Sequence, residues 1–313
     1  MKRMHIKTRS AGFAVAAVCA VVAGAALAWD PGTPQPNKYV LPPASDAVRA
    51  EGDAAKARLK GTIDVTRIVG HRGDSEAAPE NTIPAFKAAT SKGFNFETDL
   101  YLTTDGVVFA THDQFLRRKG SGMNTWSTNA VWKGQLENAD AGVWKGPEWK
   151  GVKYPTIDDL FEFAADGRFI ILEIKDPRKT LIMPKIKEAI ARHPNVNASN
   201  IFFQGATPRW LEQNLPGYRD IACRIVRSGW SIYDPPQDIA AWIRKINPKH
   251  YSVVSLRWDE EVISKELVDL AHSRGIKIVV WTVNDAPSAW AAIGRGVDWV
   301  CTDRPALLWK EMQ

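Results

Sequence analysis

The stretch TRIVGHRGDSEAAPENTIPAFKAATSKGFNFETDLYLT, residues 66–103, predicts a strand, a helix and a second strand in that order. Residues 66–73 and 95–103 are short, rich in apolar residues and bounded by Gly or Thr, which is typical of strands. Between them, residues 81–93 predict a helix with Asn81 as its N-cap, Pro84 in its first turn and Gly93 after its end. Two strands joined through a helix indicate a parallel sheet covered by helices.

The same alternation continues to the end of the chain. Nine segments predict strands, at 66–73, 95–103, 106–113, 168–176, 200–206, 220–226, 250–256, 277–285 and 298–303. A closed (β/α)8 barrel has eight places, so we expect one of the nine to be irregular or peripheral. The predicted fold class is therefore α/β, a TIM-type (β/α)8 barrel over residues 61–313, with an open doubly wound sheet as the alternative.

The first 28 residues predict a secretory signal peptide. Four Lys and Arg residues precede an uncharged, Ala-rich apolar run that ends in the small-x-small sequence Ala26-Leu27-Ala28. The alternative is an uncleaved anchor, but the run is short and a good cleavage site follows it. We expect an exported protein, periplasmic or secreted, without a stable membrane anchor after cleavage. Residues 29–60 predict a Pro-rich leader followed by a charged helix.

Cleavage changes the charge of the chain. The formal net charge is +6, and the removed segment carries four positive and no negative side chains, which leaves +2. No dense Lys/Arg stripe stands elsewhere, so the sequence argues against a nucleic-acid partner. Of the two cysteines that remain, Cys223 and Cys301, each lies in a short apolar segment, and we expect two buried free thiols.

Residues 114–155 interrupt the alternation with a Trp-rich segment after the third predicted strand. Trp126, Trp132, Trp144 and Trp149 stand there among many Gly, Lys and Asn residues. One interpretation is a small lobe held together by its own indoles. The other is a wall or lid of a substrate pocket, because the βα-loops of a barrel build its active face.

Acidic, basic and imidazole side chains gather where the early strands end. Residues two apart on a strand share a face, so both members of such a pair point the same way. In a barrel these strand ends form the catalytic rim. The set comprises Glu97 with Asp99, Glu173 with Lys175, and His71 and His112, which follow the first and third predicted strands.

Three carboxylates in one partly buried place would repel each other and raise their own pKa values. A divalent cation removes this repulsion, and oxygen-only ligands suit Mg²⁺, Ca²⁺ or Mn²⁺ rather than zinc. The alternative is that each carboxylate only pairs with a base such as Arg72 or Lys175. The whole set is harder to explain as separate ion pairs, so we predict one divalent cation, Ca²⁺ or Mg²⁺, held by Glu97, Asp99 and Glu173.

Such a site fits an anionic substrate. The cation, Arg72 and Lys175 would hold a phosphate and stabilise the charge that develops on its oxygens. His71 and His112 would act as general acid and base near neutral pH.

The ordered motifs HRG (71–73), PENT (79–82), ETD (97–99), THD (111–113), LEIK (172–175), WTVN (281–284) and DWVCTDRP (298–305) resemble the glycerophosphodiester phosphodiesterase family. The resemblance covers about residues 67 to 306. It implies a TIM-type barrel and divalent-metal hydrolysis of glycerophosphodiesters to glycerol 3-phosphate and an alcohol.

The resemblance also assigns roles to residues. It implies metal ligation by Glu97, Asp99 and Glu173, acid–base chemistry by His71 and His112, phosphate contacts by Arg72 and Lys175, and a pocket wall beside the glycerol moiety at Trp281, for which core packing is the alternative. We expect Asn81 and Asp303 to fix loops and Asp113 to orient its neighbours, with contact to the metal or to water as the alternative for Asp113. One departure stands at 204–205, where such enzymes often carry Ser-Phe and this chain has Gln204 and Gly205. It bears on the choice of head group and not on the metal centre.

The predicted function is an exported, metal-dependent phosphodiesterase that acts on small glycerophosphodiesters. A first alternative keeps the metal site but cleaves lysophospholipids or a sugar-linked phosphodiester, because indoles of residues 114–155 suit acyl chains or sugar faces. A second alternative is a non-catalytic binding barrel, since fold alone never establishes activity. The preferred cation, the head group, the oligomeric state and the attacking nucleophile do not follow from the sequence.

Overall fold

The computed structural model describes residues 43–116, 125–165, 167–227 and 236–313. The predicted signal peptide and the leader up to residue 42 lie outside these ranges. The strands are β1 (Ile68–Gly70), β2 (Asn95–Leu102), β3 (Val108–Ala110), β4 (Ile170–Ile174), β5 (Ile201–Gln204), β6 (Asp220–Arg224), β7 (Tyr251–Arg257), β8 (Lys277–Trp281) and β9 (Trp299–Thr302). The helices are α1 (Asp46–Leu59), α2 (Ile83–Thr90), α3 (Ile157–Phe161), α4 (Lys179–Arg192), α5 (Pro208–Asn214), α6 (Ile239–Lys245), α7 (Lys265–Ser273), α8 (Ala286–Gly294) and α9 (Pro305–Met312).

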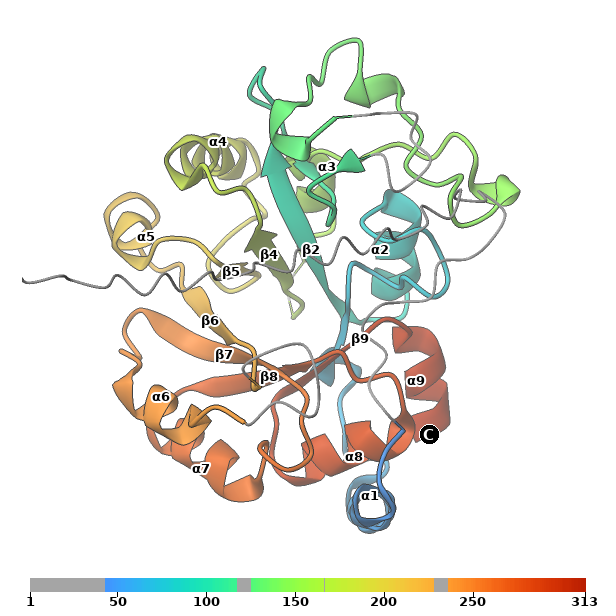
Figure 1. The fold of residues 1–313 in the computed structure, drawn as a ribbon, viewed down its shortest axis with the longest axis vertical. Coiled ribbons are helices and arrows are strands. Elements are labelled where there is room, and N and C mark those ends of the chain that lie inside the picture. Colours follow the sequence, from blue (N-terminus) through green and yellow to red (C-terminus); the bar gives the residue numbers. More distant parts are fainter. Residues whose placement is uncertain (1–42, 117–124, 166, 228–235) are drawn as a thin grey trace, which may run out of the picture. The chain divides into compact units, whose positions relative to one another are not determined.

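Eight of the described strands close into a parallel barrel. They follow one another in the order β1, β2, β4, β5, β6, β7, β8 and β9, and β1 pairs in parallel with both β2 and β9. Figure 1 shows the helices outside this ring of strands. The TIM-type barrel is therefore confirmed, and the open doubly wound sheet was wrong, because an open sheet would leave β1 unpaired on one edge.

The ninth strand, β3, is the peripheral one. It pairs antiparallel with β2 alone, with Leu100 opposite Ala110 and Leu102 opposite Val108. A tight turn joins the two strands: Gly106 has a φ of +87°, and the Thr103 amide donates to the Val107 carbonyl at 2.9 Å. So short a connection permits a hairpin but not a parallel crossover. The expectation that one of the nine predicted strands is peripheral is thereby confirmed, and His112 follows this strand.

Apolar side chains fill the space on both sides of the barrel wall. Between strands and helices lies the larger core, in which Phe86 of α2 stacks on Phe96 of β2 with ring centroids 4.6 Å apart. Inside the barrel a smaller cluster forms a plug, made of Val69, Ile171, Ile221, Val253, Val279 and Cys301. Because successive strand residues face opposite sides, Glu173 comes directly above Ile171 on the inner face. The acidic residues therefore lie directly above the apolar plug.

The helix ends depart from the sequence prediction at two places. Asn81 is not the N-cap of α2; that position belongs to Thr82, and the Asn81 side chain bonds to β2 instead. Helix α9 was not predicted, although Pro305 at its start is typical of a first helical turn. The charged helix predicted before residue 60 is α1, which packs against α8 (Figure 1).

Residues 125–155 form a lobe between β3 and α3, with a small core of its own. That core also includes Tyr101 of β2 and Phe109 of β3, and its lobe members are Ala130, Leu136, Ala139, Ala141 and Tyr154. Of the four tryptophans only Trp132 packs against it, while Trp126 is 48% exposed. The interpretation of a self-packed lobe fits, but aliphatic and tyrosine side chains hold it together rather than indoles.

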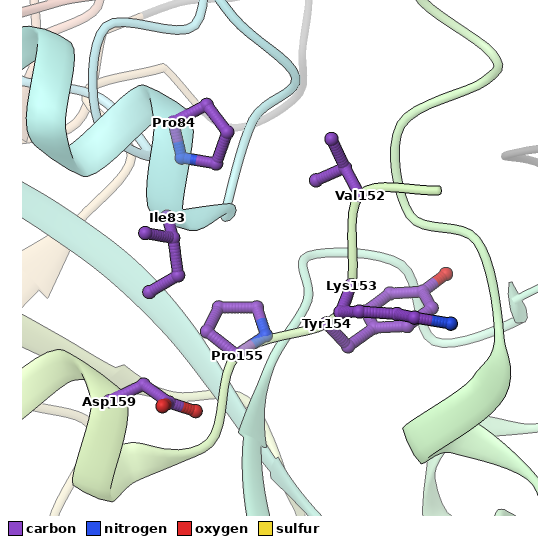
Figure 2. A pocket seen from close by; sticks show the side chains of 7 residues that line it. All are labelled: Ile83, Pro84, Val152, Lys153, Tyr154, Pro155 and Asp159. Carbon is purple, nitrogen blue, oxygen red and sulfur yellow. The ribbon is translucent and has the colours of Figure 1, made fainter. Parts of the chain in front are cut away.

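A groove separates the lobe from two helices of the barrel. Figure 2 shows Ile83 and Pro84 of α2, the lobe segment 152–155 and Asp159 of α3 around a cavity of about 300 Å³. No residue of the acidic set lines this groove. The lobe reaches the rim elsewhere, because Lys145 Nζ donates to the Ser75 carbonyl at 2.7 Å.

Both predicted cysteines are free thiols. Cys301 is buried in the barrel plug, as expected. The burial predicted for Cys223 was wrong, since this residue stands near the end of β6 and is exposed. Among the described residues, no helix is long and apolar enough to cross a membrane.

Candidate active site

Three carboxylates meet at the upper end of the barrel plug. One ligand oxygen from each of Glu97, Asp99 and Glu173 lies within 4.8 Å of the others. Strand register explains this convergence: Asp99 of β2 stands opposite Glu173 of β4, and Glu97 shares the face of Asp99. The three residues that the sequence predicted as metal ligands are therefore brought together.

Glu97 is a buried member of this cluster. Burial raises its pKa well above the ordinary value, and the carboxylates of Asp99 and Glu173 raise it further. Its Oε2 accepts from the Arg72 amide at 3.1 Å, whereas its buried Oε1 has no hydrogen-bond partner among the described residues. A buried, unpaired carboxylate oxygen beside two further carboxylates is what a hard cation would satisfy. The residues present thus fit a divalent cation.

Asp99, unlike Glu97, lies in surroundings that favour its charged form. Burial alone would raise its pKa, but the charges of His112, Lys175 and Arg72 and the Asn81 hydrogen bond lower it to about 2. Its Oδ2 accepts from Asn81 Nδ2 at 2.9 Å and lies 3.4 Å from Arg72 Nε. Asp99 is therefore an anion at neutral pH.

The two predicted phosphate contacts lie beside the acidic cluster. Lys175 Nζ is 2.7 Å from Glu173 Oε1 and 3.5 Å from Asp99 Oδ1, and Arg72 Nη1 is 2.9 Å from Glu80 Oε1. Burial lowers the pKa of each base, but the neighbouring carboxylates outweigh it and hold both pKa values above their ordinary range. The cluster has three carboxylates, whereas Arg72 and Lys175 bring two positive charges. These ion pairs therefore leave some carboxylate oxygens without a cationic partner.

The loop after β1 is held in an unusual backbone conformation. Arg72 and Asn81 have φ values of +59° and +55°, in the left-handed region that few residues other than Gly and Asn adopt. The side chain of Asn81 fastens the loop, since its oxygen accepts from Thr98 Oγ1 at 2.8 Å and its amide donates to Asp99. The prediction that Asn81 fixes a loop matches this position.

Each histidine is oriented by a carboxylate. His71 Nδ1 donates to Asp303 Oδ1 at 2.7 Å, and Asn284 Nδ2 donates to the other oxygen at 2.8 Å. His112 Nδ1 lies 3.2 Å from Asp113 Oδ1, and the Thr111 amide donates to the Asp99 carbonyl, which brings this histidine to the acidic cluster from β3. In both cases Nε2 is the nitrogen left for proton transfer.

The structure gives Trp281 and Gln204 different surroundings. Trp281 is half-buried and packs against the barrel plug, and its buried Nε1 has no partner among the described residues. Gln204 is buried at the end of β5, in register with Glu173. Gly205, which follows, has a φ of +77°.

Comparison with known proteins agrees with this geometry. Residues 71–307 match the model of the "Glycerophosphoryl diester phosphodiesterase family". The chain belongs to this family. The phosphodiesterase class predicted from the ordered motifs is thereby confirmed.

Individual relatives of this phosphodiesterase support the assignment along most of its length. A glycerophosphodiester phosphodiesterase of Caldanaerobacter subterraneus is 27% identical over 245 residues, which span 78% of this chain and 96% of that protein. A putative glycerophosphoryl diester phosphodiesterase of Silicibacter pomeroyi shares the fold with a TM-score of 0.65 and 19% identity, covering 82% and 97% of the two chains. An Oleispira antarctica phosphodiesterase, solved with sn-glycerol-3-phosphate, has a TM-score of 0.63 and 21% identity, covering 79% and 96%.

Sequence reasoning missed the partnership of His71 with Asp303 in this phosphodiesterase. Asp303 was assigned to loop fixation, and Asn284 received no role. A signal was present, because the last and first strands of a closed barrel are neighbours and both residues end such strands. The side chain of Asp303 thus lies across the barrel seam from His71.

Proposed function

We propose that this chain is an exported hydrolase that cleaves small glycerophosphodiesters to glycerol 3-phosphate and an alcohol, with a divalent cation, Ca²⁺ or Mg²⁺, held by Glu97, Asp99 and Glu173. The observation that carries the proposal is the convergence of three ligand oxygens within 4.8 Å, one each from Glu97, Asp99 and Glu173. When bound, the cation would offset the carboxylate charges and polarise the phosphate oxygens.

The residues around the cluster supply binding and proton transfer. Arg72 and Lys175 stay cationic and would hold the remaining phosphate oxygens, stabilising the charge that builds up on them. One histidine would take a proton from the attacking oxygen as the P–O bond forms. The other would give a proton to the alkoxide of the leaving alcohol as the second P–O bond breaks. Attack by water gives glycerol 3-phosphate directly, whereas attack by the glycerol 2-hydroxyl gives a cyclic phosphate that water must open in a second step.

The orienting carboxylates have a defined part in this chemistry. Asp303 holds the Nδ1–H of His71 and stabilises the imidazolium that forms when Nε2 accepts a proton. Burial raises the pKa of Asp303, but the hydrogen bond and charge of His71 lower it by more, so the carboxylate stays ionised. Asp113 would serve His112 in the same way.

Export rests on residues 1–28, which lie outside the described part of the chain. Expression in a bacterium with its export pathway intact should yield a protein that begins after Ala28 and is recovered outside the cytoplasm. An intact N-terminus on a cytoplasmic protein would contradict this part of the proposal.

The test of function is release of glycerol 3-phosphate from glycerophosphocholine in Ca²⁺, in Mg²⁺ and in EDTA. We expect release with at least one cation, none in EDTA, and a loss of about 100-fold or more in Glu97→Gln, by comparison with the 10- to 100-fold that even indirect metal contacts are worth. Glu188→Gln, on the exposed face of α4, is the matched control. A folded wild-type protein that releases no glycerol 3-phosphate from any of several glycerophosphodiesters would overturn the proposal.

A further inference from the structure

A second cavity borders the acidic cluster. Its volume is about 600 Å³, and it lies between the ends of β5 and β6 on one side and α6 on the other. Glu173 of the acidic cluster is one of its lining residues, so a molecule in the cavity reaches the reacting centre. Strands β5 and β6, whose ends line the cavity, pair over only two residues each.

Gln204 stands where the cavity meets the acidic cluster. It pairs in register with Glu173, so both side chains leave the barrel wall on the same face. The residue is only 7% exposed, yet none of the described residues hydrogen-bonds to its side-chain amide. Gln204 lines the cavity, so a molecule bound there can supply a hydrogen-bond partner to its amide.

The rest of the lining mixes polar side chains with apolar ones, which include Ile221, Ile246 and Trp242. Asp220 is buried, and its Oδ1 accepts from the Ala206 amide at 3.1 Å. Burial raises the pKa of Asp220 to about 7, so near neutral pH its carboxyl is not a fully charged anion. Asn247 and Tyr251 add an amide and a phenol, and Gly205, Ala206 and Ala222 leave room.

Two features argue against a cationic or an apolar guest. The Arg224 guanidinium lies 5.6 Å from the ring centroid of Trp242, so this indole already has a cation–π partner. Lys245 adds a second positive charge to the lining of the cavity. An acyl chain would leave the side-chain amide of Gln204 without a partner, at a cost in affinity. Vicinal hydroxyl groups, which donate and accept at once, satisfy amide and carboxyl groups together.

We propose that this cavity is the subsite for the alcohol portion of the phosphodiester, and that it takes a polyhydroxylated alcohol such as glycerol or a cyclic polyol. The inference rests on the proposed function and adds the substrate class to it. Gln204 would bind hydroxyl groups next to the scissile bond, and Asp220 would bind them deeper in the cavity. Trp242 would cover one flank of the alcohol.

The test compares three diesters that share the glycerol phosphate and differ in the alcohol: glycerophosphoinositol, glycerophosphocholine and the methyl ester, which has no group to reach the cavity. We expect kcat/KM to be highest for glycerophosphoinositol. Gln204→Met keeps the side-chain volume and removes the hydrogen bonds. It should lower kcat/KM about tenfold for the inositol diester, the loss expected for about 1.4 kcal/mol of hydrogen bonding, and leave the methyl ester within about twofold.

The outcomes separate this inference from the function on which it rests. Failure of the wild type to cleave any of the three diesters overturns the proposed function. Cleavage of all three, with Gln204→Met reducing each equally, overturns the subsite and makes Gln204 a support of Glu173 instead. A preference for glycerophosphocholine over the inositol diester overturns the polyol assignment. Gln213→Met, on the exposed side of α5, serves as the matched control and should change none of the rates.

Discussion

At the scale of single residues, Asp303 does more than fix a loop, because both of its carboxylate oxygens accept hydrogen bonds from neighbouring side chains. One oxygen accepts from His71 Nδ1 and the other from Asn284 Nδ2. An asparagine at this position has one acceptor only, so its amide would face either the Nδ1–H of His71 or the amide of Asn284, donor against donor. The imidazole would then lose its fixed orientation.

We therefore expect Asp303→Asn to lower kcat by about 10- to 100-fold while KM stays within about twofold. Steady-state kinetics on a glycerophosphodiester check this, with Asp269→Asn on the exposed face of α7 as the control. A purely structural role would instead lower the melting temperature and leave kcat per folded molecule unchanged.

Single residues also show what a sequence can and cannot reveal about the site. Glu97, Asp99 and Glu173 were predictable as a group, because alternation along a strand fixes which residues share a face. The pairing of Asp303 with His71 follows from the predicted closed barrel, which makes β9 and β1 neighbours, and not from the spacing of the two residues along the chain. The left-handed conformation of Asn81 became visible only in the backbone, since an Asn before a helix reads equally well as an N-cap.

At the scale of elements, the direction of β3 is the instructive case. Its apolar alternation predicted a strand correctly, but alternation carries no information about direction. The turn at residues 103–107 did carry that information, since a parallel crossover needs about a dozen residues or more. Loop length was thus the signal that identified the peripheral strand.

Helix α1 is a second element whose role depends on packing. A Cβ added to Gly52 would lie 2.5 Å from the backbone oxygen of Pro287 at the start of α8. The Arg295 guanidinium also holds Glu51 through both carboxylate oxygens, at 2.6 and 2.9 Å. The helix that the sequence grouped with the leader is therefore fitted closely to the barrel.

Gly52→Ala tests the contact between α1 and α8, because the direction in which the free energy of unfolding changes depends on that contact. In an unpacked helix this change stabilises by up to about 1 kcal/mol, because Gly is the poorer helix former. Against the Pro287 backbone we expect overpacking and a loss of about 1–3 kcal/mol in the free energy of unfolding. Urea denaturation measures it, and a more stable variant would show that α1 does not hold this contact in solution.

At the scale of the whole molecule, composition and alternation were enough for the fold, because eight buried strands separated by helices have few ways to pack. They were not enough for the second cavity, which lies where β5 and β6 pair over only two residues each. That pairing depends on how the barrel closes as a unit. The core of the lobe over residues 125–155 could not be predicted in this way either, because it includes Tyr101 and Phe109 of the β2–β3 hairpin.

The acidic cluster links the stability of the whole barrel to pH and to metal. Folding raises the pKa of Glu97, so the folded state favours the neutral carboxyl. Its contribution to stability is then full below the unfolded value near 4.5 and is lost as pH rises through the folded pKa. In EDTA, Glu97→Gln should therefore match the wild type at pH 4.5 and melt at a higher temperature at pH 8.

A bound divalent cation should reverse that order at pH 8. At 100 times its Kd a ligand of the folded state adds about 2.7 kcal/mol, which corresponds to roughly 5–10 °C in melting temperature for a domain of this size. We expect Ca²⁺ or Mg²⁺ to raise the melting temperature of the wild type by this amount and to leave Glu97→Gln nearly unchanged, with Glu188→Gln behaving as the wild type. Differential scanning calorimetry measures all three proteins without relying on activity. If neither cation moves the wild-type transition at millimolar concentration, Lys175 and Arg72 neutralise the cluster by themselves, and the three carboxylates are an ion-pair network rather than a metal site.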